Sequence, residues 1–544
     1  MTRGLVARFL AALLLLSFFA LALTSAIQKS PTMDEQNHIA RGAAYLGTGD
    51  PRLSVEHPPL VNVLSALPAH LLLDLTLPLD TVWWEAGEWY HFADLFLWQV
   101  NGDFRQIVFL ARLPIIGLGM LLVSLVFRWA SEILGPWGGL VAALFCGLDP
   151  NILAHTRLAT TDLGGTFFIF FAAYAFWRLL SKPSVGRVII AGLALGLAFS
   201  AKLYALLFAP IFACLLLVRW WRKRDGVFLL RAAGLMTLLA GIALFVVWGV
   251  YGFQVGSLNG GEFVVPAAPY IKGVKAILSF AGGGRPGYLL GDVSKQGWWY
   301  YFLVAFLVKT PLPTLLALGL AIYSAIQYRI RSLWGIAWSP LLYFLVLTFS
   351  RLNLGYRHLL PVLPFLAVYL GRLSDLSGGA IFAINRLSVG KWITLFLGVA
   401  LVVSTLVIYP HFLSYFNPIA GGAENGWHVL VDSNIDWGQD VELLRRWVAE
   451  EGIGQIRLGL FGTAHPEAYG IDCILLPGTP HGGLLWNDPP FDPNQPEPGI
   501  YVISVTNLVG LNASDGNPYA WFRSRSPDEK IGYSLFVYKV GNDE

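Results

Sequence analysis

The sequence predicts a polytopic α-helical membrane protein that ends in a small α/β domain outside the membrane. Of its 544 residues, 56% are hydrophobic and only 13% are charged, and the mean hydropathy is +0.59. Soluble domains carry about a quarter charged residues. Apolar windows long enough to cross roughly 30 Å of hydrocarbon recur about eleven times before residue 410. After that point the apolar runs shorten, and Asp, Asn, Gly and Pro become more frequent.

The charged residues set the expected orientation of these windows. The windows centre near residues 18, 118, 144, 170, 195, 212, 242, 312, 342, 365 and 400. Lys and Arg concentrate in the short connections on one side, which places the N-terminus in the cytoplasm. Three larger segments then lie outside: residues 28–106, residues 253–297 and residues 410–544. We therefore expect a transmembrane domain over residues 1–409 and an extracytoplasmic domain over residues 410–544. The net charge of +3 is small for this length, which argues against nucleic acid as a partner.

The first external segment is expected to hold helices that lie on the membrane surface. The stretches DEQNHIARGAAYL and PPLVNVLSALPAHLLLDL have helix-like apolar spacing, and both are too short to span. The second places Leu60, Leu64 and Leu71 on one side. Aromatic residues typical of a membrane interface follow, namely Trp83, Trp84, Trp89 and Tyr90. Charged groups at the start of this segment are thus expected at the depth of the lipid headgroups.

An acidic pair, Asp34 and Glu35, opens this segment directly after the first span. Either the pair caps the surface helix, since acidic residues favour a first turn, or it performs chemistry at the bilayer surface. His57 follows in the sequence EHPPL, where two prolines fix the backbone. An alcohol becomes a good nucleophile only when a base takes its proton, and a departing phosphate needs positive charge. Carboxylates near basic side chains are therefore what sugar transfer from a lipid phosphate requires.

Further charges on the same side of the membrane extend this set. Asp162 begins a helix in HTRLATTDLGG, where an acidic residue is usually structural. In SRLNLGYRHLLPVLP, Arg351, Arg357 and His358 lie at a helix start, either to anchor in headgroups or to bind the carrier phosphate.

Two lysines lie in apolar surroundings. Lys309 is about ten residues into a span, and an ionisable residue at that depth is a functional candidate by default. The alternatives are that Lys309 extends its ammonium group to the interface or pairs with a backbone carbonyl. Lys202, in AFSAKLYAL at another helix junction, is a similar candidate for phosphate binding.

The C-terminal stretch is expected to form an α/β domain. VELLRRWVAEEG is typical of a helix that ends at Gly452, and IRLGLF, GIYVISV and YSLFVYKV are typical of strands. Before the helix, DSNIDWGQD spaces Asp432, Asn434 and Asp436 as a calcium loop would. The Gly and Glu that an EF-hand needs at its sixth and twelfth places are absent. Asx turns and helix capping are therefore favoured over calcium binding.

These motifs together resemble the GT-C glycosyltransferases. The similarity is to bacterial relatives of dolichyl-phosphate-mannose protein mannosyltransferases and lipid A aminoarabinose transferases. It rests on MDEQNHIARGAAYL, EHPPL, TTDLGG, GYRHLLPVLP, GYLLGDVSKQGWWYYF…KTPLP and DSNIDWGQD. The aminoarabinose enzymes have Lys where this chain has His57. The first loop also lacks the Asp-x-Asp pair of the metal-dependent oligosaccharyltransferases, so the resemblance implies no metal and no other cofactor.

The resemblance implies inverting transfer of a sugar from a polyprenyl-phosphate carrier to an acceptor hydroxyl of protein, lipid or glycan. It implies Asp34 as general base, Glu35 as support, and Asp162 to orient the acceptor or the phosphate. It also implies that His57, Arg357 and His358 hold the phosphate. The alternative is a transporter or flippase that binds the same lipid-linked sugar without chemistry. The charges gather on one side rather than along a path through the bilayer, which favours the enzyme.

Overall fold

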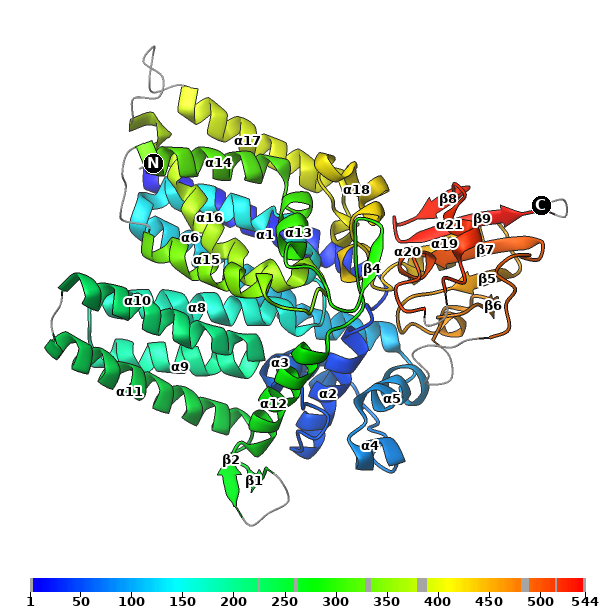
Figure 1. Cartoon of the computed structure of the whole chain (residues 1–544), viewed down its shortest axis with the longest axis horizontal. Coiled ribbons are helices and arrows are strands. Elements are labelled where there is room, and N and C mark those ends of the chain that lie inside the picture. The colour runs from blue at the N-terminus through cyan, green and yellow to red at the C-terminus, as the bar shows by residue number, and fades with distance from the viewer. Residues whose placement is uncertain are drawn as a thin grey trace.

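The computed structural model describes residues 3–223, 226–258, 263–327, 334–378, 389–480, 489–513 and 516–541. Long helices lie side by side over most of the molecule, and a sheet domain formed by the C-terminal residues lies at one end of them (Figure 1). This is the predicted fold class: a helical membrane protein with a small C-terminal α/β domain.

The described part of the chain holds five helices that are long and apolar enough to cross a membrane. They are Gly4–Ile27 within α1 (Arg3–Ile27), α6 (Phe104–Gly147), α8 (Thr161–Ser181), α11 (Gly226–Val250) and Gly390–Val407 within α17 (Val389–Val407). The pair α13 (Tyr301–Lys309) and α14 (Leu312–Gln327), bent by 108°, makes a sixth if it counts as one span.

The predicted number of about eleven spans is therefore not confirmed. Two predicted windows, near residues 118 and 144, fall in α6, which Gly135 interrupts with a φ of 78° before Pro136. Others form shorter apolar helices: α9 (Val185–Ala201), α10 (Phe208–Lys223), α15 (Trp334–Thr348) and α16 (Leu363–Leu370). Basic connections at residues 224–225, 328–333 and 379–388 lie outside the described residues, and the orientation stays a prediction.

The first loop forms two helices that cross closely, α2 (Glu35–Thr48) and α3 (Pro59–Leu72). A side chain at Gly42 would collide with the backbone carbonyl of Asn62, so only glycine allows this approach. The face of α3 that packs on the protein is formed by small and polar residues, whereas its leucines stay at least partly exposed. That arrangement suits a helix whose leucines face lipid.

Short helices α4 (Val82–Ala86) and α5 (Trp89–Asp94) follow. Two of the four predicted interfacial aromatics, Trp84 and Tyr90, are buried in the protein instead. Arg52 explains part of this difference, because its guanidinium lies 4.5 Å from the ring of Trp84.

The second predicted external segment is less regular. Its elements are β1 (Val255–Ser257), β2 (Val264–Pro266), α12 (Ala268–Gly283), β3 (Gly287–Leu289) and β4 (Asp292–Ser294). Each strand pair is a short antiparallel ribbon.

The C-terminal sheet has five strands in the order β6-β5-β7-β9-β8. Strand β5 runs parallel to both of its neighbours, β6 and β7. Strand β9 runs antiparallel to both of its neighbours, β7 and β8. The strands are β5 (Ile456–Gly459), β6 (Cys473–Leu475), β7 (Gly499–Ser504), β8 (Glu529–Ile531) and β9 (Leu535–Val540). The helices here are α18 (Gly422–Asn425), α19 (Val441–Glu450), α20 (Val505–Leu508) and α21 (Ala520–Arg523). The predicted helix and all three predicted strands are present as α19, β5, β7 and β9.

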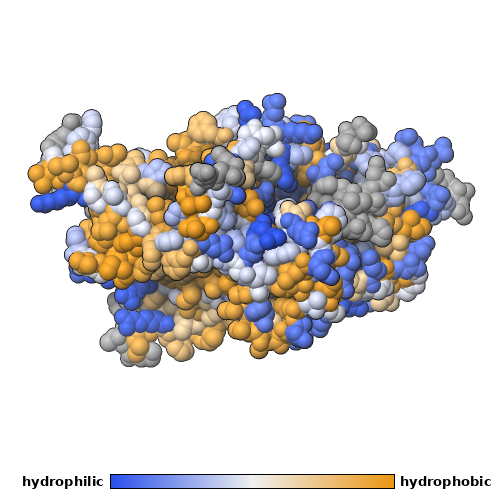
Figure 2. Space-filling model, turned by 90° about the horizontal axis from the view of Figure 1, so that it is seen from below, coloured by the Kyte–Doolittle hydropathy of each residue, from blue (hydrophilic) through white to orange (hydrophobic). Residues whose placement is uncertain are grey.

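The surface reflects this division. Figure 2 shows hydrophobic side chains gathered over the helical part, and more hydrophilic ones toward the end with the sheet domain. Hydrophilic side chains reappear at the opposite tips of the helices, as expected when apolar spans end in water.

Candidate active site

Four charged side chains from separate parts of the sequence meet at one end of the long helices. Arg357, in the 3-10 turn Tyr356–Val362, donates from Nη1 to Oδ2 of Asp34 over 2.7 Å. The same nitrogen lies 3.9 Å from Oδ2 of Asp162, the second residue of α8. Lys202, directly after α9, pairs with the other oxygen of Asp162. The structure thus brings together a predicted base, a second carboxylate and two of the predicted phosphate ligands.

Asp34 is the accessible carboxylate of this group. Its side chain is 31% exposed, whereas that of Asp162 is 1% exposed. Asp34 precedes α2, but its side chain makes no capping hydrogen bond, so the capping interpretation fails for this residue. Burial alone would raise its pKa, but the nearby Arg357 and His38 and the Arg357 hydrogen bond hold the pKa below its usual range. Asp34 is therefore ionised at neutral pH and able to accept a proton.

Glu35, its neighbour, lies in the interior with no exposed surface. Its two oxygens accept from Nε and Nη2 of Arg112, each over 2.8 Å. They also accept backbone N–H groups of Thr32 at 2.7 Å and Ala159 at 2.8 Å. Burial would raise the pKa of Glu35, but Arg112 and these hydrogen bonds lower it. With its lone pairs engaged in this way, Glu35 fixes the backbone shortly before Asp34 and shortly before Asp162, and does not face the site.

Arg112 completes this anchor. Its remaining donors reach three backbone carbonyls at the end of α1, at Ala26, Lys29 and Ser30. Carbonyls at a helix end have no partner within the helix. One buried arginine therefore ties α6 to the end of α1 and to the start of α2.

The predicted histidines lie around the four charged residues. The ring of His57 meets the ring of His38 edge-on, with centroids 4.8 Å apart. His38 in turn donates from Nδ1 to Oδ1 of Asn62 over 3.0 Å. Burial lowers the pKa of His57 well below its usual value and that of His38 to about 4. Burial and Arg357 lower that of His358 to about 3. These rings are neutral, so they can offer a phosphate a hydrogen bond but not a positive charge.

The remaining predicted ligands take other positions. Lys309 is buried at the end of α13 and donates to the carbonyls of Leu413 at 2.7 Å and Asn434 at 2.6 Å. This is the carbonyl pairing that the sequence left open as the alternative to a functional role. Arg351 is exposed in the connection before the turn that carries Arg357.

Three residues around the site are not among the site candidates that the sequence predicts. Arg112, inside the apolar run FLARLPII, carried a usable signal, because an arginine within a span needs a partner. His38 also did, since it lies one helical turn after Asp34. Trp437, whose ring lies 4.5 Å from the Arg357 guanidinium, carried none.

The motif DSNIDWGQD is where the sequence spacing resembles a calcium loop. Among the residues that the structure describes, no group of three or more His, Cys, Asp or Glu side chains is arranged to hold a metal ion. Asn434 Oδ1 accepts from the N–H of Tyr356 at 2.9 Å, and Asp436 Oδ2 accepts from the N–H of Thr506 at 3.0 Å. Both bonds reach distant segments, and Asp440 before α19 makes no side-chain capping hydrogen bond, so this motif does not cap that helix. Asp436 Oδ1 accepts from the N–H of Gly438 at 3.4 Å, as the Asx-turn interpretation expects.

Comparison with known proteins bears on this geometry. Residues 97–250 match the family of dolichyl-phosphate-mannose-protein mannosyltransferases. The resemblance inferred from the motifs is confirmed for this segment, which includes Arg112, Asp162 and Lys202. Asp34 and Arg357 lie outside it. No curated protein matches the chain.

Solved structures are also similar to this chain. One is ArnT from Cupriavidus metallidurans bound to undecaprenyl phosphate, at 12% identity and a TM-score of 0.49, covering 99% of this chain and 98% of that one. Another is the oligosaccharyltransferase of Archaeoglobus fulgidus in the apo form, at 11% identity and a TM-score of 0.42, covering 71% of this chain and 56% of that one.

Proposed function

We propose that this protein is a GT-C-type glycosyltransferase that moves a sugar from a polyprenyl-phosphate carrier to an acceptor hydroxyl, with inversion at the anomeric carbon. The observation that carries the proposal is the Asp34–Arg357–Asp162 arrangement. It joins an accessible carboxylate to a guanidinium at the end of apolar helices. The mannosyltransferase match over residues 97–250 supports the same reaction class.

The proposed reaction is a single displacement. The acceptor oxygen attacks the anomeric carbon as the bond from that carbon to the phosphate oxygen breaks. The acceptor proton passes to Asp34, and the bonding electrons leave with the polyprenyl phosphate. General base catalysis of this kind contributes about 10²- to 10⁴-fold to rate. Asp162 stays ionised beside Lys202 and orients the basic groups rather than taking the proton.

Arg357 links the base to the leaving group. In the structure its guanidinium binds Asp34, which keeps the carboxylate a weak base. The donor phosphodiester, which carries one negative charge, competes for the same guanidinium, because arginine binds phosphate through paired N–H donors, and the departing polyprenyl phosphate carries a second charge. Donor binding then withdraws Arg357 from Asp34 and raises the pKa of Asp34 when a base is required. Lys202 and the neutral His57 and His358 supply further donors to the phosphate.

The decisive experiment measures transfer from radiolabelled polyprenyl-phosphate sugars by the purified protein in lipid nanodiscs. Mannosyl and aminoarabinosyl donors are tested with hydroxyl acceptors from proteins, lipids and glycans. Asp34→Asn is expected to lower transfer by about 10²-fold or more. Asp50→Asn is the matched control, since Asp50 lies in the same loop, is 35% exposed and pairs with Arg52. Equal transfer by wild type and Asp34→Asn would rule out the base, and translocation without a glycosylated product would establish a flippase.

The proposed location is a bacterial-type inner membrane, with a cytoplasmic N-terminus and an extracytoplasmic C-terminal domain. A single cysteine at exposed Asn494, in a protein freed of its native cysteines, should react with a reagent added outside intact cells. Labelling from the cytoplasmic side alone would reverse this topology and place the site on the other face.

A further inference from the structure

The segment of residues 432–440, which carries the motif DSNIDWGQD, contacts two other segments of the protein. One leads to Asp34 and the other carries Arg357. On one side the segment is hydrogen-bonded to the residues that precede Asp34 in the sequence. The N–H of Ser30 donates to the carbonyl of Gln439 at 3.0 Å, and that of Met33 donates to the carbonyl of Trp437 at 2.9 Å. The base therefore follows directly on a residue that is hydrogen-bonded to the C-terminal domain.

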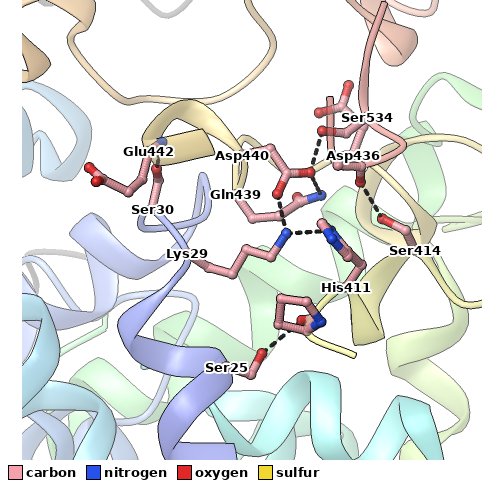
Figure 3. Close-up of polar contacts among 12 residues, drawn as sticks. Ser25, Lys29, Ser30, His411, Ser414, Asp436, Gln439, Asp440, Glu442 and Ser534 are labelled. Atoms are coloured by element: carbon pink, nitrogen blue, oxygen red, sulfur yellow. Dashed lines mark hydrogen bonds and ion pairs between the residues drawn. The ribbon is translucent and has the colours of Figure 1, made fainter. Parts of the chain in front are cut away.

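A buried ion pair locks this side. Lys29, at the end of α1, donates to Asp440 over 2.5 Å and to Nδ1 of His411 over 2.7 Å (Figure 3). Asp440 also accepts from Ser534 at 2.7 Å and from Gln439 at 3.1 Å. Both partners of the ion pair are buried, so the geometry of this end of the 432–440 segment is strongly fixed.

On its other side the segment holds the turn that carries Arg357. Ser433 donates to the carbonyl of Leu354 over 2.6 Å, and Asn434 accepts from the N–H of Tyr356. Gly355, between them, has a φ of 116°, and a side chain there would collide with Ser433. Three successive residues of the turn, Leu354, Gly355 and Tyr356, thus contact the 432–440 segment directly.

Trp437 lies where the two sides meet. Its ring is 1% exposed, and the Arg357 guanidinium lies 4.5 Å from its centre. A guanidinium over an indole face is attracted by the ring quadrupole, and more so away from water. Arg357 is therefore fixed by the ring on its face and by the two carboxylates at its edge.

We propose that Trp437 is a positioning residue for the transfer reaction, which holds Arg357 between Asp34 and Asp162. The inference rests on the proposed function. It gives the C-terminal domain a role in catalysis: the domain completes the active site, in addition to any part it has in choosing the acceptor.

The test compares Trp437→Phe, Trp437→Met and Trp447→Met for transfer per folded molecule. Trp437→Phe keeps an aromatic face and should retain transfer within about 3-fold of wild type, whereas Trp437→Met should lose about 10-fold or more in kcat. Trp447, buried in the same domain on α19, is the matched control. Its replacement should lower the yield of folded protein but not kcat.

The pH profile separates positioning from mere structural support. A loosely held Arg357 lowers the pKa of Asp34 less in the free enzyme, so the acidic limb of kcat/KM, which reports the free enzyme, should move to higher pH in Trp437→Met alone. Wild-type kcat and an unshifted acidic limb in folded Trp437→Met would overturn the inference.

A binding experiment keeps this inference separate from the proposed function. Trp437→Met should bind undecaprenyl phosphate about 10-fold more weakly than wild type, because its phosphate ligand Arg357 is no longer held in place. If wild type transfers no sugar, the proposed function fails, but the affinity for undecaprenyl phosphate still shows whether Trp437 positions Arg357. Equal affinity of wild type and Trp437→Met would overturn the inference on its own.

Discussion

Replacement of Glu35 by Gln tests whether the two neighbouring carboxylates have different roles. The change keeps the size of the side chain but removes its charge. It also turns one acceptor oxygen into an N–H donor. Both oxygens of Glu35 accept N–H groups from Arg112 and from the backbone of Thr32 or Ala159. Whichever oxygen of Glu35 the NH2 group of Gln replaces, that group faces at least two N–H donors and cannot accept from them.

The expected cost follows from burial. The side chains of Glu35 and Arg112 are 0% and 2% exposed, so neither water nor salt can replace the lost charge. Breaking one partner of a buried ion pair costs about 3–5 kcal/mol, because the other charge is left uncompensated. Asp34→Asn removes a charge that is 31% exposed and partly solvated, and should cost about 1 kcal/mol or less.

The assay is unfolding of each variant in the same detergent, followed as the fraction that remains monodisperse. Glu35→Gln should be much less stable but retain transfer per folded molecule within about 10-fold, and Asp34→Asn should show the opposite pattern. Since folding lowers the pKa of Glu35, its contribution is complete above its unfolded value of 4.5 and is lost as pH falls through the folded pKa. The stability gap between wild type and Glu35→Gln should thus shrink only in acid. A gap below about 1 kcal/mol at pH 7 would refute the reasoning.

Three other changes probe separate contacts. Arg357→Lys keeps the charge but cannot bridge two carboxylates and stack on a ring, so kcat should fall by about 10-fold or more in the transfer assay. Gly355→Ala should lower the unfolding free energy by about 1–3 kcal/mol in the detergent assay, because its φ of 116° is strained for alanine. Burial lowers the pKa of His465, but the hydrogen bond and charge of Asp94, 2.7 Å away, raise it overall. Its stabilising effect is full below the unfolded pKa and is lost as pH rises through the folded pKa, so Asp94→Asn should destabilise the protein at pH 6 and less at pH 8.5.

The sequence identified the fold class and the main charged residues because both leave local signals. Apolar windows, the changed composition after residue 410 and alternating strands each follow from the residues in a short stretch. The four charges that meet at the site were candidates for the same reason, since Asp34, Asp162, Lys202 and Arg357 interrupt apolar surroundings. Such interruptions are costly enough to be noticed in a single sequence.

What the sequence could not supply was the pairing of distant segments. Lys309, about ten residues into a predicted span, and Arg357, at a predicted helix start, are both phosphate-binding candidates in the sequence. The structure separates them, because one meets backbone carbonyls and the other meets carboxylates. Trp437 was noticed only as a residue that breaks a calcium pattern. Its contact with Arg357 joins positions 80 residues apart, and no periodicity encodes such a contact.

The acidic pair shows why adjacent residues need a structure to be told apart. Successive side chains at a helix start point about 100° apart, since 3.6 residues complete a turn. At the start of α2 that rotation turns Glu35 inward to Arg112 and leaves Asp34 facing Arg357. Glu35 holds the backbone that positions Asp34. Asp34 remains free to give up its ion pair with Arg357 and accept a proton. A base that must be both accessible and accurately placed is served by such a division of roles, because a carboxylate engaged by five donors, as Glu35 is, has no lone pair left to take the proton of an acceptor hydroxyl.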